Sequence, residues 1–415
     1  MQYRILGIYW RSSSSGGILP AAVIELRSMI TKNKIIWVAV IVFVIALAAA
    51  MSALYGSKPA LKPDSSGEIN LPDGFRIDVF SEDLGGSPVS NPGPRMMLLK
   101  DNVLFVTVPN QGRVIALPDM NGDKRADEAV TFIDKLNNPH GIDYYNGWFY
   151  IAEENRVIRV KAKDNSLTAD MGSLEVLIDN LPAGGHFTRT VKIHNNSLYL
   201  SIGSSCNVCN EQDERRASIL KCSLEGTGCS IYAKGLRNAV GFVFHPVTGK
   251  MYATDNGRDY LGDELPPDEI NIIEEGNNYG WPICYGKNIH DTDFDKNVYV
   301  RNPCMEPFEM PSIIDLQAHS APLGLAFYYG GSFPAEYRGN LFVAFHGSWN
   351  RGEPTGYKIV RINMNDFTVN DFATGWLSGG NVTGRPVDII VADDGSIFVS
   401  DDNSGKIYRI SYKSS

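Results

Sequence analysis

The feature that most constrains the fold is a pattern that recurs six times between residues 95 and 412. Each unit has an apolar strand, a tight turn and a second strand that ends in a small or polar loop. An Arg-flanked strand often follows. A run of immunoglobulin-like domains would need about 100 residues per unit, whereas shorter repeats of alternating hairpins are typical of a β-propeller. The units begin at Arg95, His140, Arg189, Val240, Leu323 and Pro386. The sequence therefore predicts an all-β fold, a six-bladed β-propeller, over residues 71–412.

The charge of the chain restricts its partners. The formal net charge is −9, although residues 1–34 carry five basic side chains against one acid. The body of the chain is therefore more acidic than the whole. Because binding to phosphate backbones needs a basic surface, we expect no nucleic-acid partner.

An uncharged apolar run of 20 residues, 35–54, precedes the repeats. At about 1.5 Å per residue it is long enough to span the hydrocarbon core of a bilayer. We expect a transmembrane or signal-anchor helix over 35–56 and a linker over 57–70. Basic residues before the run place residues 1–34 in the cytoplasm and the propeller outside it, extracellular or periplasmic. Two alternatives stay open: secretion after signal-peptide cleavage, and a start at Met29 that leaves residues 1–28 untranslated.

Six cysteines fit an exported protein. The simplest pairing is three local disulfides, although six cysteines allow 15 connectivities. The motif CNVC could also indicate redox chemistry or a zinc site. However, no His follows it to attach haem, and the second CxxC that a zinc site would need is absent. The expected pairs are Cys206–Cys209, Cys222–Cys229 and Cys284–Cys304.

Polar residues gather at the ends of the fourth repeat's hairpin, GLRNAVGFVFHPVTGKMYATDNGRD. Arg237 and Asn238 stand before it, and residues 256–259 follow it. In a propeller the loops at one end of the strands face the same side, so side chains from several blades converge over the channel. Arg351 and Arg385 occupy similar places in their own units. Three such cations predict an acidic ligand there; the alternative is surface ion pairs.

His186 follows two glycines at the start of the third repeat. A lone histidine often has only a structural role. On an exposed loop, however, a neutral imidazole can act as a general base near pH 7.

Two segments are rich in oxygen ligands of the kind that Ca²⁺ prefers. One is TDNGRDYLGDELPPDEINII, which follows the fourth hairpin. The other, DMNGDKRADE, spaces its oxygens like the start of a calcium loop but has Val130 where an EF-hand has its twelfth-position Glu. It is a second candidate calcium site, formed by Asp119, Asn121, Asp123 and Asp127.

Several motifs together resemble the glucose/sorbosone dehydrogenase family, in its sorbosone dehydrogenase-like branch. They include GGHFTRTVKIHNNSLYLSIGSSCNVC, GLRNAVGFVFHPVTGKMYATDNGRD, DEINIIEEGNNYGWP and GRPVDIIVADDGSIFVSDD, and they occur in the family's order over roughly residues 70–412. The resemblance implies a six-bladed propeller that uses pyrroloquinoline quinone (PQQ) with calcium.

The resemblance also implies roles for single residues. His186 would be the general base, and Arg237 and Asn238 would contact the quinone oxygens and the substrate. The backbone carbonyls of Gly257 and Arg258 would bind calcium.

Two further arginines match cofactor contacts of the family. Arg385 would pair with a PQQ carboxylate, and Arg351 falls near a lysine that contacts PQQ in the soluble glucose enzymes. His319 would line the site.

The expected reaction is the oxidation of an aldose or aldehyde by hydride transfer to the quinone. Electrons would then pass to a membrane quinone or a cytochrome. Two other classes stay open: a calcium-dependent, lactonase-like propeller hydrolase with several carboxylate ligands, and a non-catalytic extracellular binding propeller.

Overall fold

The computed structural model describes residues 69–86, 92–305 and 309–412 of the 415-residue chain. The helix expected over 35–56 lies outside these residues, as do residues 1–34 and most of the linker. Within the described part of the chain, no helix has the length and apolar character needed to cross a membrane.

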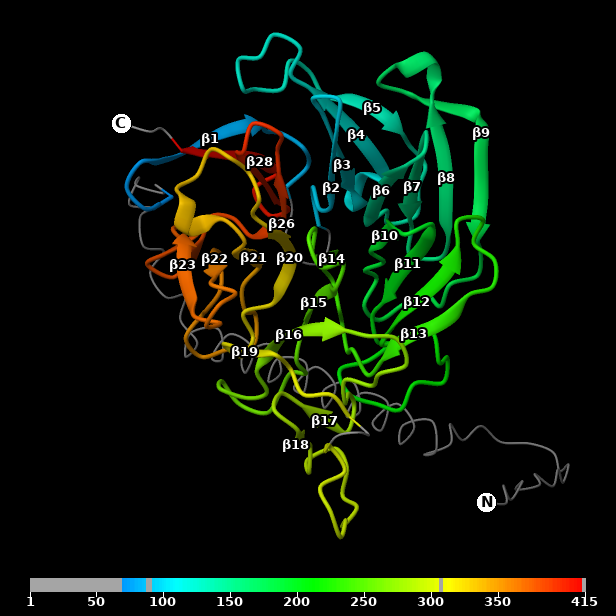
Figure 1. The fold of residues 1–415 in the computed structure, drawn as a ribbon, viewed down its shortest axis with the longest axis vertical. Coiled ribbons are helices and arrows are strands. Elements are labelled where there is room, and N and C mark those ends of the chain that lie inside the picture. The colour runs from blue at the N-terminus through cyan, green and yellow to red at the C-terminus, as the bar shows by residue number, and fades with distance from the viewer. Residues whose placement is uncertain (1–68, 87–91, 306–308, 413–415) are drawn as a thin grey trace, which may run out of the picture. The chain divides into compact units, whose positions relative to one another are not determined.

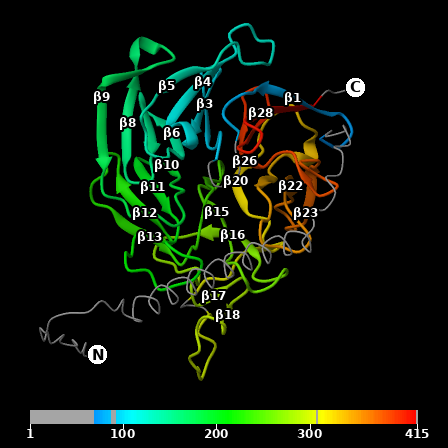
Figure 2. The ribbon, with the colours of Figure 1, turned by 180° about the vertical axis from the view of Figure 1, so that it is seen from behind.

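Six antiparallel sheets of four strands form the body of the molecule. The first strands of the sheets surround a common centre, and the later strands lie progressively farther out (Figure 1). The same ring is seen from behind in Figure 2. The expectation of an all-β, six-bladed propeller is therefore confirmed.

The first three blades are each formed by one continuous stretch of chain. Blade 1 contains β2 (Met97–Lys100), β3 (Val103–Val108), β4 (Arg113–Pro118) and β5 (Val130–Ile133). Blade 2 contains β6 (Gly141–Tyr145), β7 (Trp148–Ala152), β8 (Val157–Ala162) and β9 (Ala169–Ile178). Blade 3 contains β10 (Val191–His194), β11 (Ser197–Ile202), β12 (Ser218–Ser223) and β13 (Ser230–Lys234).

The last three blades carry insertions or a strand from elsewhere in the chain. Blade 4 contains β14 (Phe242–Phe244), β15 (Met251–Asp255), β16 (Asp268–Ile273) and β19 (Ile314–Leu316). Blade 5 contains β20 (Pro322–Phe327), β21 (Leu341–Phe345), β22 (Lys358–Ile362) and β23 (Val369–Ala373). Blade 6 contains β26 (Pro386–Val391), β27 (Ile397–Asp401), β28 (Lys406–Tyr412) and β1 (Phe75–Ser81).

Small elements complete the described structure. Two short hairpins pair β17 (Cys284–Tyr285) with β18 (Ile289–His290) and β24 (Leu377–Ser378) with β25 (Asn381–Val382). Helix is limited, in the described ranges, to the 3₁₀ turns η1 (Pro109–Gln111), η2 (Lys163–Asn165) and η3 (Ala335–Tyr337). The three expected disulfides are formed, Cys206–Cys209, Cys222–Cys229 and Cys284–Cys304.

The hydrophobic core is divided among the gaps between neighbouring blades. Between blades 1 and 2, for example, the rings of Phe105 and Phe149 lie 4.7 Å apart, centroid to centroid. The second strand of a blade is covered on both faces, and every residue of β3, β15, β21 and β27 is buried. This explains why apolar residues predominate in these strands.

Strand β1 closes the ring, because it pairs antiparallel with β28 as the outermost strand of blade 6. Its first residue, Phe75, makes edge contacts with Phe333 (4.8 Å) and Phe372 (5.0 Å) of blade 5 and with Tyr412 (4.9 Å) of β28. The N-terminal strand thus joins the last two blades by backbone hydrogen bonds and by aromatic packing.

We expect Phe75→Ala to lower the free energy of unfolding by about 2–4 kcal/mol, because truncation of a buried Phe costs about 3–5 kcal/mol and Phe75 is only partly buried. Urea denaturation measures this change. The control is Arg76→Ala on the same strand, whose exposed side chain should contribute less than about 0.5 kcal/mol. Equal effects of both substitutions would contradict the closing role of Phe75.

Candidate active site

A cavity of about 370 Å³ lies at the face where the first strands of the blades begin and the second strands end. Its lining comes from five of the six blades and combines three arginines, three histidines and two aspartates. These are Arg95, Arg237, Arg385, His186, His319, His346, Asp259 and Asp268. The structure thus brings together six of the residues singled out from the sequence: His186, Arg237, Asn238, Gly257, His319 and Arg385.

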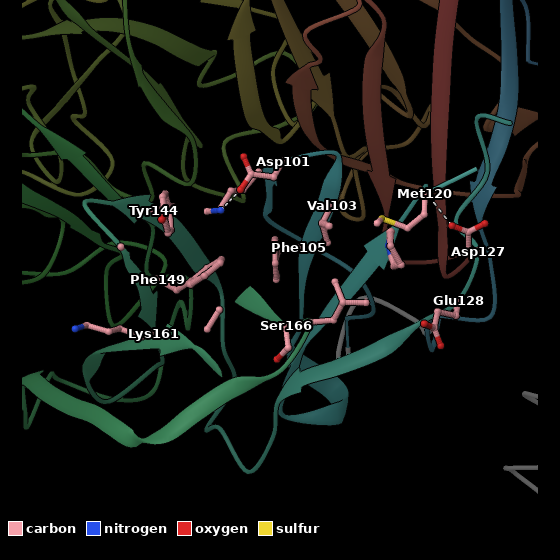
Figure 3. Close-up of a pocket in the computed structure, with 15 residues that line it drawn as sticks. Asp101, Val103, Phe105, Met120, Asp127, Glu128, Tyr144, Phe149, Lys161 and Ser166 are labelled. Atoms are coloured by element: carbon pink, nitrogen blue, oxygen red, sulfur yellow. Dashed lines mark hydrogen bonds and ion pairs between the residues drawn. The ribbon is translucent and has the colours of Figure 1, made fainter. Parts of the chain in front are cut away.

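A larger cavity, about 860 Å³, lies between blades 1 and 2 near the turns that join their first two strands (Figure 3). Phe105, Tyr144 and Phe149 line it. Three of its charged groups already have partners: Lys100 pairs with Asp101, and the Met120 amide donates to Asp127. Size alone would favour this cavity, but its titratable groups come from two blades, whereas those of the smaller cavity come from five.

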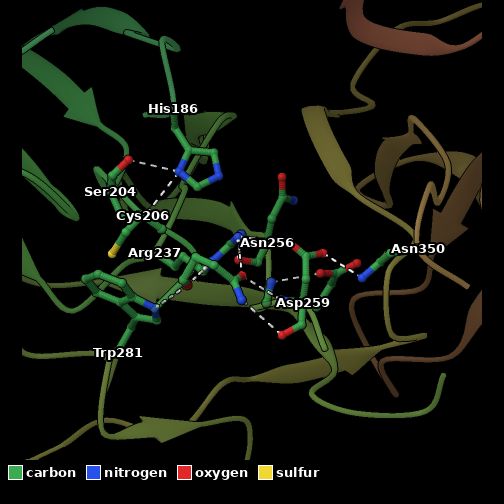
Figure 4. Close-up of polar contacts among 11 residues, drawn as sticks. His186, Ser204, Cys206, Arg237, Asn256, Asp259, Trp281 and Asn350 are labelled. Carbon is green, nitrogen blue, oxygen red and sulfur yellow. Dashed lines mark hydrogen bonds and ion pairs between the residues drawn. The ribbon is translucent and has the colours of Figure 1, made fainter. Parts of the chain in front are cut away.

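His186 is held by one ring nitrogen and presents the other. Its Nδ1 lies 3.0 Å from the Ser204 carbonyl oxygen and 3.0 Å from Ser204 Oγ (Figure 4). A carbonyl oxygen only accepts hydrogen bonds, so Nδ1 carries the proton and Nε2 is the basic nitrogen. Burial, and then the nearby Arg237 charge, lower the pKa of His186 to about 3. The ring is therefore neutral at physiological pH.

Arg237 is buried, and all of its guanidinium nitrogens are engaged. Nε donates to the Asn207 carbonyl oxygen (2.9 Å), Nη1 to that of Asn256 (3.2 Å), and Nη2 to Asn207 Oδ1 (3.0 Å). Nη2 also lies 3.3 Å from Asp259 Oδ2. Burial lowers the pKa of Arg237, and the neighbouring carboxylates oppose this shift. The group is thus a fixed cation in the cavity wall.

Asn238 lies against His186 because Gly203 leaves room for both. A Cβ at residue 203 would stand 2.5 Å from Asn238 Oδ1 and 2.6 Å from His186 Cβ. Asn238 Oδ1 accepts a hydrogen bond from Thr188 Oγ1 (2.9 Å). This bond leaves the amide nitrogen as the donor that Asn238 can offer to a ligand.

Gly257 lies in the cavity wall, and its amide donates to Asp268 Oδ1 (2.8 Å). No described residue donates a hydrogen bond to the carbonyl oxygen of Gly257 or of Arg258. The Arg258 side chain turns away from the cavity into ion pairs with Asp291 (2.6 Å) and Asp293 (2.9 Å). Gly257 and Arg258 can therefore offer a cation only their backbone carbonyl oxygens.

Two of the three expected arginines reach the cavity, and one does not. Arg385 donates to the His346 and Gly347 carbonyl oxygens (3.3 and 2.9 Å), and its guanidinium lies over the Tyr357 ring. Arg351, in contrast, is absent from the cavity lining. Its guanidinium binds the Ala318 carbonyl oxygen (3.3 Å) and groups of the 263–264 loop.

The sequence reasoning overlooked a buried group on the opposite wall. Arg95 Nη1 pairs with Asp402 Oδ2 (2.6 Å), and His346 Nε2 lies 2.9 Å from Asp402 Oδ1. Each residue stands next to a strand end of its repeat: Arg95 before β2, His346 after β21 and Asp402 after β27. An alignment of the six repeats on their strand ends would have identified these positions.

The candidate calcium loop at residues 119–127 is held together by its own backbone. Asp119 Oδ2 accepts from the Lys124 amide (3.2 Å), and Asp127 Oδ2 accepts from the Met120 amide (2.6 Å). Among the described His, Cys, Asp and Glu side chains, the only set of three close enough to share a metal ion is Cys206, Cys209 and Glu211, and those two cysteines form a disulfide.

Comparisons with known proteins identify related sequences and related structures. The sequence profile of the TrAA12-like family matches residues 90–413. An uncharacterized protein of Borreliella burgdorferi is 34% identical over 365 residues, which cover 83% of this chain and 91% of that protein. The PQQ-dependent pyranose dehydrogenase of Coprinopsis cinerea is 25% identical over 84% of this chain, which spans 55% of that enzyme. The calcium structure of the Trichoderma reesei family AA12 enzyme superposes with a TM-score of 0.70 at 21% identity, over 86% of this chain and all of that one.

We expect Gly203→Ala to cost about 1–3 kcal/mol of unfolding free energy, because its Cβ would overlap Asn238 and His186 in a packed wall. The matched control is Gly331→Ala, where an added Cβ meets nothing within 4 Å. That substitution should change stability by less than about 0.5 kcal/mol. Urea denaturation distinguishes the two, and an unaffected Gly203→Ala protein would contradict the close approach.

Proposed function

The chain belongs to the TrAA12-like family, and we propose that it oxidises a sugar with PQQ and calcium. Its characterised relatives are PQQ-dependent sugar dehydrogenases and hence oxidoreductases. The substrate class is an aldose or an aldehyde of the glucose or sorbosone type. The observation that carries the proposal is the convergence of a neutral, oriented histidine and three arginines on one cavity.

The cavity fits an anionic cofactor. PQQ is a flat quinone with three carboxylates, and planar guanidinium groups suit carboxylates. Arg95, Arg237 and Arg385 are the cations in the cavity wall. A volume of about 370 Å³ lies in the range of small-ligand pockets, about 300–1,000 Å³.

We assign the cofactor contacts from this arrangement. Arg237 and Asn238 would contact the quinone and the substrate, and Arg385 would bind a carboxylate of PQQ. Arg351 is engaged outside the cavity, so Arg95 would supply the third cation. The free carbonyl oxygens of Gly257 and Arg258 would be the ligands for calcium.

In this arrangement the residues of the chain have separate roles in the oxidation. His186 Nε2 accepts the proton of the substrate hydroxyl, since Nδ1 is fixed as a donor to Ser204. Arg237 and the Asn238 amide stabilise the negative charge that develops on the neighbouring oxygens. When bound, PQQ supplies the hydride acceptor and Ca²⁺ supplies a Lewis acid.

The hydrolase alternative needs carboxylates that are free to bind a metal. Both oxygens of Asp268 accept backbone amides, those of Gly257 (2.8 Å) and Ala321 (2.9 Å). Asp259 is engaged by Asn350 and Arg237. The two carboxylates of the lining therefore already have partners, which favours the dehydrogenase over the hydrolase.

We also propose that the propeller works outside the cytoplasm, because three disulfides persist only where thiols are oxidised. The two alternatives for the N-terminal run, a membrane anchor and a cleaved signal, both give this location. The reduced cofactor would deliver its electrons to a membrane quinone or a cytochrome.

We expect His186→Ala to reduce kcat/KM by about 10²–10⁴, the usual contribution of a general base, while PQQ still binds. Dye reduction on a panel of aldoses and aldehydes, with PQQ and Ca²⁺ added, measures the rate, and a spectroscopic titration measures binding. The control is His194→Ala, whose ring stacks on Phe244 away from the cavity. No PQQ binding by the wild type would remove the dehydrogenase proposal and favour the binding propeller.

The pH profile gives an independent check on His186. A pKa of about 3 leaves the base unprotonated throughout the neutral range. We therefore expect kcat/KM to show no loss of activity near the ordinary histidine pKa of about 6.5 as the pH falls from about 8 to 5. Since the folded pKa is depressed, the neutral ring stabilises the fold fully above about pH 6.5, and this contribution declines toward pH 3. An acidic limb near 6.5 would show that another environment surrounds the base.

A further inference from the structure

We propose that the disulfide-closed loop Cys206–Cys209 is the element that positions both the base and the principal cation of the site, with Asn207 as the positioning residue for Arg237. The consequence for cofactor affinity rests on the proposed function. The structural part, that this loop holds the cavity wall, does not.

Asn207 is the common partner of two segments of the cavity wall. Its carbonyl oxygen and Oδ1 accept from Arg237 Nε (2.9 Å) and Nη2 (3.0 Å). Its Oδ1 also accepts from the Asp259 amide (2.8 Å), and its Nδ2 donates to the Asp259 carbonyl oxygen (3.1 Å). One side chain thereby fixes the guanidinium and the loop that follows β15.

The same loop is linked to His186 through Ser204. Ser204 Oγ donates to the Cys206 carbonyl oxygen (2.7 Å), and the Ser204 amide donates to the Arg237 carbonyl oxygen (2.8 Å). The Ser204 carbonyl oxygen accepts from His186 Nδ1 and from the His186 amide, both at 3.0 Å. The segment 204–207 therefore lies between the base and the cation and is bonded to both (Figure 4).

The Cys206–Cys209 disulfide closes the part of the loop that holds Asn207. Cys206 and Cys209 flank Asn207 and Val208, and the loop has no strand of its own. Ordering an irregular segment costs conformational entropy at each residue, about 1–2 kcal/mol for the backbone. A disulfide across the loop reduces the number of conformations that the loop can adopt, so Asn207 stays within hydrogen-bond distance of Arg237.

The disulfide between Cys222 and Cys229 offers a control. Cys222 lies in β12 and pairs with Cys229 across a turn, and neither lines the cavity. A Cys222→Ser/Cys229→Ser variant removes a bond of the same kind without touching segment 204–207.

The first experiment follows hydrogen–deuterium exchange in the full chain without cofactor. Exchange should become faster at the Asp259 and Ser204 amides in Cys206→Ser/Cys209→Ser. In Asn207→Leu, which has a similar size but no acceptor, it should become faster at Asp259. Asn207→Asp keeps an oxygen for the Asp259 amide and should restore its protection. The Cys222→Ser/Cys229→Ser control should exchange as the wild type does at both amides.

The second experiment titrates the same proteins with PQQ and Ca²⁺. We expect the affinity to fall about 10- to 100-fold in Asn207→Leu and in Cys206→Ser/Cys209→Ser, the range for losing hydrogen bonds to a charged group, and to stay within about 2-fold in the control.

Unchanged exchange at Asp259 in the Asn207→Leu and Cys206→Ser/Cys209→Ser variants would overturn the positioning role, as would equal losses in the control. Faster exchange together with a wild type that binds no PQQ would support the structural role and refute the proposed function instead. Normal PQQ affinity in variants with faster exchange would overturn the link from the loop to cofactor binding.

Discussion

The arrangement of the site depends on buried carboxylates that accept the backbone amides of the loops. Asp255, the last residue of β15, accepts from the amides of Arg237 (2.9 Å) and Asn238 (2.6 Å). Asp401, the last residue of β27, accepts from the amide of Arg385 (2.8 Å). A loop without regular structure must satisfy its amides in some way when it is buried. Here a carboxyl group at the end of a neighbouring strand accepts the hydrogen bonds of these amides. It thereby fixes the backbone position of each arginine.

This constraint explains how an acidic protein maintains a cationic cavity. The carboxyl groups of Asp255 and Asp401 lie behind the loops and accept hydrogen bonds from backbone amides, whereas the guanidinium groups of Arg237 and Arg385 extend past them into the lining. Burial raises the pKa of Asp268 to about 6, so its carboxylate is still mostly ionised at neutral pH. The ring then gathers such loops from several blades at one face, which no single blade could do.

The sequence predicted a large part of this picture from particular residues. The repeats predicted six blades, local spacing predicted the three disulfide pairs, and the motifs indicated the family of PQQ-dependent sugar dehydrogenases to which the comparisons also lead. The motifs of three different blades predict that His186, Arg237 and Arg385 meet, and these residues do line one cavity. The same reasoning predicts Arg351 there, but its loop turns its guanidinium toward residues 263–264 instead.

By itself, the sequence determined the blade number, the local disulfide pairs and the loops that carry the site, because strand alternation, turns and short cysteine spacings are local properties of the chain. Only the tertiary structure decided which side chains of those loops face the cavity. That choice depends on partners far away in the sequence: Asp402 pairs with Arg95, Asn207 holds Arg237, and Gly203 admits Asn238 beside His186. The Arg95–Asp402 pair needs the closure of the ring, which brings the first and last blades together through β1, and the other contacts need neighbouring blades to pack side by side.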